Sequence, residues 1–244
     1  MLTRTDLSGQ PIIITKSAHQ GVYKNYRARI LDDLEKVPCD KAILIIRHAD
    51  RDGALNALID AEQNINDRGR ERARQMGLGV HRFPRLAFSS SPVHRCVETC
   101  GCISTGHGTK ATIEETEVLG MRAPTMLRPR DAYALMQTLG LERFIDEYVA
   151  DKLDPNVVMP CQRGAQLLFH FAEQRMKSTG ADLTVLVSHD MLLTPAMVKY
   201  FGFDIHKNGL CPFLDGMVLY PMDDGFEVRH ADRVLRLDHD CLPT

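Results

Sequence analysis

Two short, almost entirely apolar runs constrain the fold of this chain more than any other feature. Residues 42–46 read AILII and residues 183–187 read LTVLV. A strand with one solvated face alternates apolar and polar residues, whereas a near-continuous apolar run of this length is typical of a strand covered on both faces. Strands of that kind occur in parallel sheets whose crossover connections place helices on both sides. We therefore expect these two runs to form the centre of an α/β domain.

Helical patterns alternate with the other predicted strands. Asn66 and Asp67 are typical caps for a helix that runs to about Gly77. Pro92 is expected in the first turn of the helix that follows a strand at 86–89. Apolar spacing predicts further helices at 20–37, within 131–150, at 163–177 and after 187 to about Tyr200, and further strands within 112–119 and at 213–220, 226–230 and 234–237.

This alternation predicts an α/β fold, a three-layer α/β/α sandwich with a mainly parallel central sheet. Residues 1–38 are interpreted as an N-terminal extension whose helix packs on the core, because Pro38 ends that helix before the first buried strand. Residues 39–244 are expected to form a single domain. Within it, residues 101–160 have the least regular pattern and are interpreted as a partial lid or insertion.

Composition excludes several classes of function. The chain has 30 Lys and Arg against 32 Asp and Glu, which predicts no nucleic-acid partner because such proteins usually present a basic face. No apolar run approaches the roughly 18 residues of a membrane span, and the N-terminus has no secretory pattern. Seven scattered cysteines without paired zinc-site spacing indicate reduced thiols in a cytoplasmic protein, with Cys96, Cys100 and Cys102 buried on or near a helix.

Chemically versatile side chains follow three of the predicted strands at the point where each strand ends. The three segments are RHADR at 47–51, SSSPVHR at 89–95 and SHD at 188–190. Ligands of open α/β sheets bind at the carboxyl ends of the strands, so these segments are expected to meet. Arginine donates paired hydrogen bonds to phosphate oxygens. Arg47, Arg51 and Arg95, with His48 and His189, therefore predict a site for a phosphate dianion.

Longer segments around these residues resemble a known family. IIRHADR at 45–51, FSSSPVHRCVET at 88–99 and VLVSHD at 185–190 resemble the three signature segments of the histidine phosphatase superfamily, which includes phosphoglycerate mutases and histidine acid phosphatases. NDRGRERARQMG at 66–77 resembles a helix that covers the edge of the family's active site. Ala49 departs from the usual Arg-His-Gly, and because alanine is small we expect the close backbone packing to survive.

The resemblance implies a phosphoglycerate mutase-like fold and a metal-independent phosphomonoesterase that needs no cofactor. His48 would be the nucleophile, forming a covalent phosphohistidine intermediate. His189 would donate a hydrogen bond to the phosphoryl group, and Arg47, Arg51 and Arg95 would bind the phosphate. The partner implied is a small phosphorylated substrate, without nucleic acid or membrane. The oligomeric state stays open, with a homodimer as one alternative.

The proton donor for the leaving oxygen has more than one candidate. Asp190 is favoured because an adjacent His-Asp pair resembles the acid-phosphatase branch of the family, as does Arg51 after the first histidine. Glu115 and Glu117 are the alternatives, because they lie where the mutase-containing branch keeps a glutamate. Chain length and the N-terminus resemble the mutase-containing branch.

Other functions remain open at this point. One is a phosphomutase of the same superfamily. Another is a metal-dependent phosphohydrolase, with His48, Asp50, His189 and Asp190 as ligands. A third is a phosphate-binding module without activity. The loop arginines Arg122, Arg128 and Arg130 are candidates to bind a second acidic group, and Met121, Met126 and Met136 are interpreted as packing residues.

Overall fold

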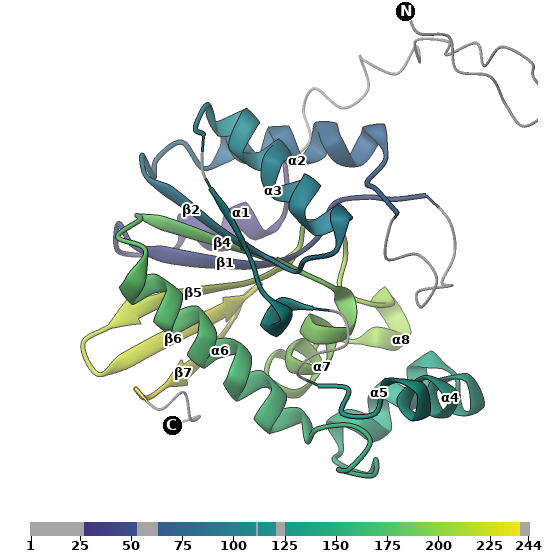
Figure 1. Cartoon of the computed structure of the whole chain (residues 1–244). Helices are drawn as coiled ribbons and strands as arrows, with labels where there is room; N and C mark the ends of the chain where they lie inside the picture. Colours follow the sequence, from purple (N-terminus) through teal and green to yellow (C-terminus); the bar gives the residue numbers. More distant parts are fainter. Residues whose placement is uncertain (1–26, 53–62, 111, 121–124, 240–244) are drawn as a thin grey trace, which may run out of the picture.

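The computed structural model describes residues 27–52, 63–110, 112–120 and 125–239 (Figure 1). Its centre is a seven-stranded sheet with the strand order β3-β2-β4-β1-β5-β6-β7. The pairs β1–β4, β2–β4 and β2–β3 are parallel and the pairs β1–β5, β5–β6 and β6–β7 are antiparallel, so five of the seven strands point the same way. The strands are β1 (Ala42–Arg47), β2 (Leu86–Ser90), β3 (Ile113–Glu115), β4 (Leu183–Ser188), β5 (Gly216–Met222), β6 (Gly225–His230) and β7 (Arg233–Leu237).

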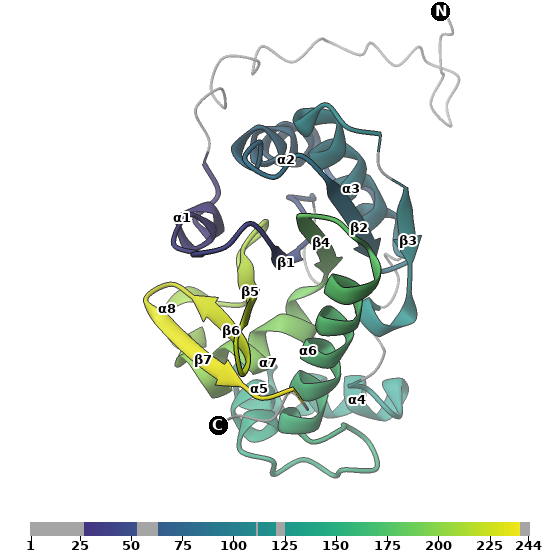
Figure 2. The same ribbon diagram turned by 90° about the vertical axis from the view of Figure 1, so that its left-hand side faces the viewer.

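Both faces of the central strands are covered. Along β1, Leu44 and Ile46 belong to the core on the side of α1 to α3, while Ile43 and Ile45 belong to the core on the side of α6 and α7. Figure 2 shows these two helical layers on opposite sides of the sheet. Because successive side chains of a strand point to opposite faces, a strand buried on both sides must be apolar throughout. The predicted three-layer α/β architecture with a mainly parallel sheet is confirmed.

Helices cover the sheet and continue beyond it. Asn66 caps α2 as the sequence predicts, because its side chain accepts a hydrogen bond of 2.8 Å from the Gly69 N–H. The helices are α1 (Ile30–Glu35), α2 (Asp67–Gly79), α3 (His94–His107), α4 (Pro129–Leu139), α5 (Leu141–Val149), α6 (Cys161–Ser178), α7 (Asp190–Phe201) and α8 (Ile205–Asn208), with a 3-10 turn at Glu117–Leu119.

Three predicted boundaries were wrong. Pro92 lies before the helix and not in its first turn, since Val93 is the N-cap and α3 begins at His94. The strand predicted within 112–119 divides into β3 and the 3-10 turn, because the Thr116 side chain caps that turn by accepting from the Val118 N–H. The strand predicted at 213–220 begins at Gly216, because residues 211–215 form a loop.

Two predicted helices also differ in extent. Of the helix predicted at 20–37, residues 20–26 lie outside the described residues, and α1 accounts for the rest; its Ile30, Leu31 and Leu34 belong to the same core as α2 and α3. In α6, Leu168 and Phe169 are buried as expected. Leu167, whose apolar side chain belongs to the same predicted helix, is 38% exposed.

The segment predicted as a partial lid or insertion divides into two parts. Residues 101–119 complete α3 and add the edge strand β3 and the 3-10 turn. Helices α4 and α5 instead form a third apolar cluster with α8 and the chain around Val158, beside α7 (Figure 1). Among the described helices, none combines the length and apolarity needed to cross a membrane.

The pairing of β4 with the strands on both sides of it aligns the carboxyl ends of the three strands. β4 lies between β1 and β2, with Arg47 opposite Ser188 and Ser90 opposite Val187. Parallel strands in register bring their carboxyl ends to one edge of the sheet. The segments that follow β1, β2 and β4 therefore emerge side by side, as the sequence predicts.

Helix α2 is pressed against the chain that follows β1. A Cβ atom at Gly69 would lie 2.3 Å from the backbone oxygen of Asp50, so any side chain there would force the helix away. We expect Gly69→Ala to lower the free energy of unfolding by about 2 kcal/mol, measured by urea denaturation. The matched control is Gly101→Ala in α3, where a Cβ meets nothing within 4 Å. That substitution should raise the free energy of unfolding by about 1 kcal/mol, and equal effects of the two would contradict this packing.

Candidate active site

His48 follows β1 and is held in one tautomer. Its side chain is almost completely buried, at 2% exposure. The ring Nδ1 lies 2.8 Å from the carbonyl oxygen of Ala49, which can only accept, so Nδ1 carries the proton. The Arg95 Nε donates to the ring Nε2 over 3.0 Å. The lone pair of His48 is therefore on Nε2.

His189 follows β4 and has the opposite tautomer. Its Nδ1 accepts from the Arg95 Nη2 over 3.2 Å, so the proton lies on Nε2, which donates to the Ser91 Oγ over 2.9 Å. The two imidazole rings lie 5.5 Å apart, centroid to centroid. One guanidinium from α3 thus bridges the two histidines that the sequence predicts to meet.

Both imidazoles are kept neutral. The pKa of His48 lies well below its ordinary value, chiefly because burial disfavours the charged ring, with His189 and Arg47 adding repulsion. Burial, together with Arg95, Arg47 and Arg51, lowers the pKa of His189 to about 3. A neutral His48 has a free electron pair, which a nucleophile requires.

Arg47 is held from several sides and in turn holds Asp190. Its Nη1 donates to the Cys211 carbonyl oxygen over 2.7 Å, and its Nη2 lies 2.5 Å from the Asp190 Oδ2. The guanidinium carbon lies 4.0 Å from the centre of the Phe213 ring, and that ring lies 5.5 Å from the ring of His48. The other oxygen of Asp190 accepts from the Met191 N–H over 2.8 Å. Asp190 is thus an oriented carboxylate at the start of α7.

The loop at 211–215, which carries Phe213, is anchored by the segment that begins α1. The Arg29 Nε donates to the Asp215 Oδ2 over 2.8 Å, and its Nη1 donates to the Asp33 Oδ2 over 2.6 Å. The Asp215 carbonyl oxygen accepts from the Arg47 N–H over 2.9 Å. A continuous set of contacts therefore joins α1 to the arginine that holds Asp190.

Two arginines retain donors that no described residue satisfies. The Arg51 Nη1 donates to the Gln63 Oε1 over 2.6 Å, but its Nε is buried and has no hydrogen-bond partner among the described residues. The Nε of Arg47 is likewise buried and has no hydrogen-bond partner among the described residues. Guanidinium N–H groups are strong donors to anions, so Arg51, which lines the cavity described below, can donate to a phosphate oxygen there.

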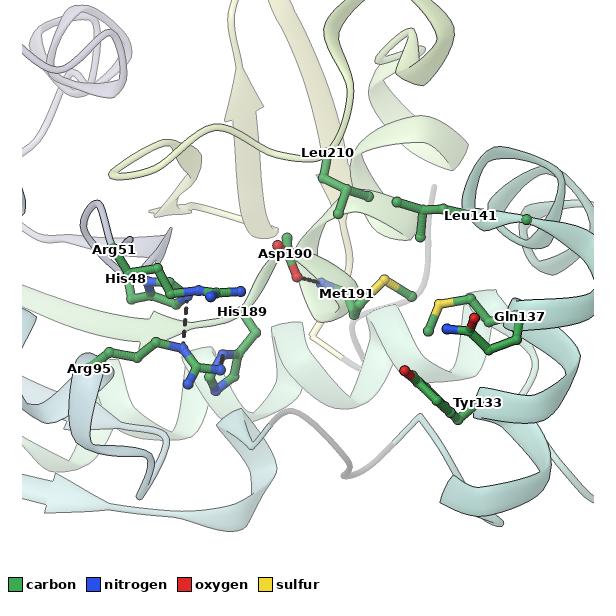
Figure 3. A pocket seen from close by; sticks show the side chains of 12 residues that line it. His48, Arg51, Arg95, Tyr133, Gln137, Leu141, His189, Asp190, Met191 and Leu210 are labelled. Carbon is green, nitrogen blue, oxygen red and sulfur yellow. Dashed lines mark hydrogen bonds between the residues drawn. The ribbon is translucent and has the colours of Figure 1, made fainter. Parts of the chain in front are cut away.

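The predicted residues converge on one cavity (Figure 3). His48, Arg51, Arg95, His189 and Asp190 line one part of it; Arg47 does not line it but forms an ion pair with Asp190. The remaining lining residues are Tyr133, Met136, Gln137, Gly140, Leu141, Met191 and Leu210.

The alternative acids lie elsewhere. Glu115 is exposed at the end of β3 and lines a separate cavity with His94 and Glu98. Glu117 is exposed in the 3-10 turn. Neither lines the cavity of His48.

The residues after His48 support the backbone. Asp50 accepts two hydrogen bonds, of 2.6 and 2.8 Å, from the Arg72 Nη1 on α2, so its carboxylate attaches that helix to the loop. The Ala49 N–H donates to the Thr99 Oγ1 over 3.0 Å, and Ala49 is fully buried without a left-handed backbone, so the expected close packing is present. In the part of the chain that the structure describes, no three His, Cys, Asp or Glu side chains gather as metal ligands would.

Several residues around the site were missed or misread from the sequence. The sequence analysis gives Ser91 no role of its own, yet its hydroxyl orients His189. Phe213 has no motif around it that marks a role. Met136 packs against the third apolar cluster as expected and also lines the cavity, whereas the basic side chains Arg128 and Arg130 are exposed and do not line it. Arg122 and Met121 lie outside the described residues, and Met126 packs against the third apolar cluster.

Comparisons with known proteins agree with the resemblance seen in the sequence. Residues 43–119 match the family model described as histidine phosphatase superfamily (branch 1). No curated protein matches the chain in sequence. Two solved structures share its fold: a mycobacterial glucosyl-3-phosphoglycerate phosphatase in complex with VO3, at 13% identity and a TM-score of 0.52 over 78% of this chain and 97% of that one, and Bacillus stearothermophilus YhfR, at 15% identity and a TM-score of 0.52 over 82% of this chain and 99% of that one.

The buried neutral histidines make stability depend on pH. Unfolded, His189 titrates near its ordinary pKa of about 6.5, whereas folded its pKa is about 3. As the pH falls from 7 to 5 the unfolded chain takes up a proton that the folded protein excludes, so stability falls, by about 2 kcal/mol for this group. We expect His189→Gln to lose less free energy of unfolding over this range than the wild type. The exposed His170→Gln should keep the wild-type slope, and equal slopes for all three proteins would contradict a neutral His189.

Proposed function

We propose that this chain, on its resemblance to the histidine phosphatase superfamily, hydrolyses a phosphate monoester through a phosphohistidine on His48. One observation carries the proposal: His48 is neutral, its Nδ1–H is bound to the Ala49 carbonyl, and its Nε2 lone pair meets only the Arg95 N–H among the described residues. An imidazole nucleophile requires a proton fixed on one ring nitrogen, here Nδ1, and a lone pair on the other, here Nε2.

Phosphate binding begins with the arginines. An incoming dianion offers acceptors to Arg51 and Arg95, which line the cavity, and reaches Arg47 by displacing Asp190 from it. Once a phosphate oxygen accepts the Arg95 hydrogen bond, the Nε2 of His48 is free to attack phosphorus. The His189 Nε2–H, now bound to Ser91, is a further donor for the phosphoryl oxygens. These cationic and neutral donors stabilise the negative charge of the transition state.

Two displacement steps then complete the reaction. In the first, a bond forms between the His48 Nε2 and phosphorus, the ester P–O bond breaks, and the leaving oxygen takes a proton. We assign that proton to Asp190, which lines the cavity: when the phosphate replaces Asp190 as the partner of Arg47, the freed carboxylate takes up a proton from solvent and then gives it to the leaving oxygen. In the second step water attacks phosphorus, the P–N bond breaks, and the Asp190 carboxylate takes the proton of the water.

Two other readings of the site have less support. A metal-dependent phosphohydrolase would need Asp50 as a ligand, but Arg72 and Arg68 already bind that carboxylate. A non-catalytic phosphate-binding module would not require the nucleophile tautomer of His48. A phosphomutase shares the first displacement step, and acceptance of the phosphoryl group by a second hydroxyl in place of water would identify it.

The cysteines support the proposal of a cytoplasmic location. All six cysteines in the described part of the chain are free thiols, and Cys96, Cys100 and Cys102 are buried in α3 as the sequence predicts. Burial raises the pKa of the Cys96 thiol to about 12, so it stays protonated beside His189. Such thiols are typical of a reducing compartment.

The central prediction concerns the covalent intermediate. Mixing the wild type with 32P-labelled phenyl phosphate and quenching in alkali should trap phosphoenzyme that acid then hydrolyses, and turnover should continue in EDTA. His48→Ala should abolish both the label and turnover, while the control His170→Ala, an exposed histidine on α6, should retain both. Turnover without label, or loss of turnover in EDTA, would contradict the phosphohistidine proposal. Inhibition by vanadate, which imitates the phosphoryl group in the transition state, would support it.

The proton donor is tested with two leaving groups. Asp190→Asn should lower kcat for an alkyl phosphate by about 10²–10⁴, because a poor leaving group needs the proton most, and should change kcat for 4-nitrophenyl phosphate far less. Glu115→Gln and Glu117→Gln should leave both rates unchanged, since neither glutamate lines the cavity. A selective loss on the alkyl ester in one of the glutamate variants would assign the donor there.

A further inference from the structure

The cavity that contains His48 has two chemically different parts. The histidines, Arg51, Arg95 and Asp190 occupy one part (Figure 3). Across the open space lies a wall contributed mainly by other elements, which we call the neutral wall. It consists of Tyr133, Met136 and Gln137 from α4, Leu141 from α5, Met191 from α7 and Leu210 after α8.

The neutral wall is the outer surface of the third apolar cluster. Met136, Leu141, Met191 and Leu210 all pack partly buried against that cluster, so their remaining exposed area faces the cavity. The polar groups of the wall are the phenol of Tyr133 and the amide of Gln137, and both are uncharged. Of the described residues that line the cavity, all the charged ones lie on the phosphate side.

The basic side chains at the start of α4 do not add a positive charge to the neutral wall. Arg128 and Arg130 are exposed at the start of the helix and do not line the cavity. An anionic leaving group would therefore exchange water for apolar and uncharged side chains, with no cation among the described residues of the neutral wall to pair with it.

We propose that the substrate is a phosphate monoester whose leaving group is uncharged and carries an apolar portion of about the size of an aromatic ring. This inference rests on the proposed function, because it assigns the leaving-group side of the same site. The Met and Leu side chains and the Tyr133 ring cover the apolar portion. Tyr133 and Gln137 supply one neutral hydrogen bond each to a hydroxyl or amide.

The test compares two nearly isosteric esters. 3-Carbamoylphenyl phosphate and 3-carboxyphenyl phosphate differ in one neutral amide against one carboxylate, and phenyl phosphate serves as the unsubstituted reference. For the wild type we expect kcat/KM to be at least about tenfold higher for the carbamoyl ester than for the carboxyl ester. Tyr133→Ala should lower kcat/KM for phenyl phosphate more than for methyl phosphate, which has no ring to cover.

A charge placed on the neutral wall should reverse the preference. Gln137→Arg should raise the ratio of kcat/KM for the carboxyl ester to kcat/KM for the carbamoyl ester by about tenfold or more, because the new cation pairs with the carboxylate and the amide loses its neutral partner. The matched control is Thr138→Arg, which adds the same charge one residue along α4 at an exposed position that does not line the cavity. It should leave the preference unchanged.

The outcomes separate the two proposals. Phosphoenzyme formation together with equal or better use of the carboxyl ester by the wild type would overturn the neutral leaving group and leave the proposed function intact. The same holds if Thr138→Arg shifts the preference as much as Gln137→Arg, because the wall would then not contact the leaving group. Absence of both turnover and phosphoenzyme with all the esters would overturn the proposed function and this inference with it.

Discussion

The site depends on a single buried guanidinium that bridges two imidazoles. Arg95 donates through Nε to His48 and through Nη2 to His189, and its side chain is only 2% exposed. A guanidinium can only donate, so each ring must present a lone pair to it, and each ring must therefore place its own proton on the far side. The Ala49 carbonyl oxygen and the Ser91 Oγ accept the hydrogen bonds from those N–H groups. Burial is the main reason that the pKa of each ring is lowered, and the charge of Arg95 adds to this effect at both rings.

The sequence predicted the part of the site that lies at the strand ends. His48 and His189 follow strands whose continuous apolar composition identifies them, Arg95 lies in the first turn of the helix after β2, and the parallel register aligns the ends of these three strands. The fold class was predictable for the same reason, since burial on both faces leaves an unambiguous pattern. The helix cap at Asn66 was likewise a local property of its own side chain.

The rest of the site could not be predicted because it is assembled from distant, unremarkable residues. Phe213 contacts Arg47 only because Arg29 and Asp215 anchor its loop, and those two residues are far apart in the chain. Tyr133 and Gln137 line the cavity because α4 packs on a separate apolar cluster, which no local pattern reveals. Conversely, Arg128 and Arg130 were plausible ligands by charge alone, and their exposed positions on α4 remove them. Sequence patterns show where a residue lies in its own element, whereas these contacts depend on how elements pack.

The position of β4 in the sheet also determines at what stage of chain synthesis the site can form. β1 and β2 precede β4 by a long stretch of chain, yet they do not pair with each other; β4 lies between them and pairs with both. During synthesis, His48 and Arg95 therefore emerge well before the strand that sets their separation, and the histidine that completes the triad of rings and guanidinium follows that strand directly. Such long-range parallel pairing is slow to form, because a large loop must close before any contact is gained. A partly synthesised chain thus carries His48 and Arg95 without the strand that aligns them, so the cavity between them and His189 can form only after β4 has been made.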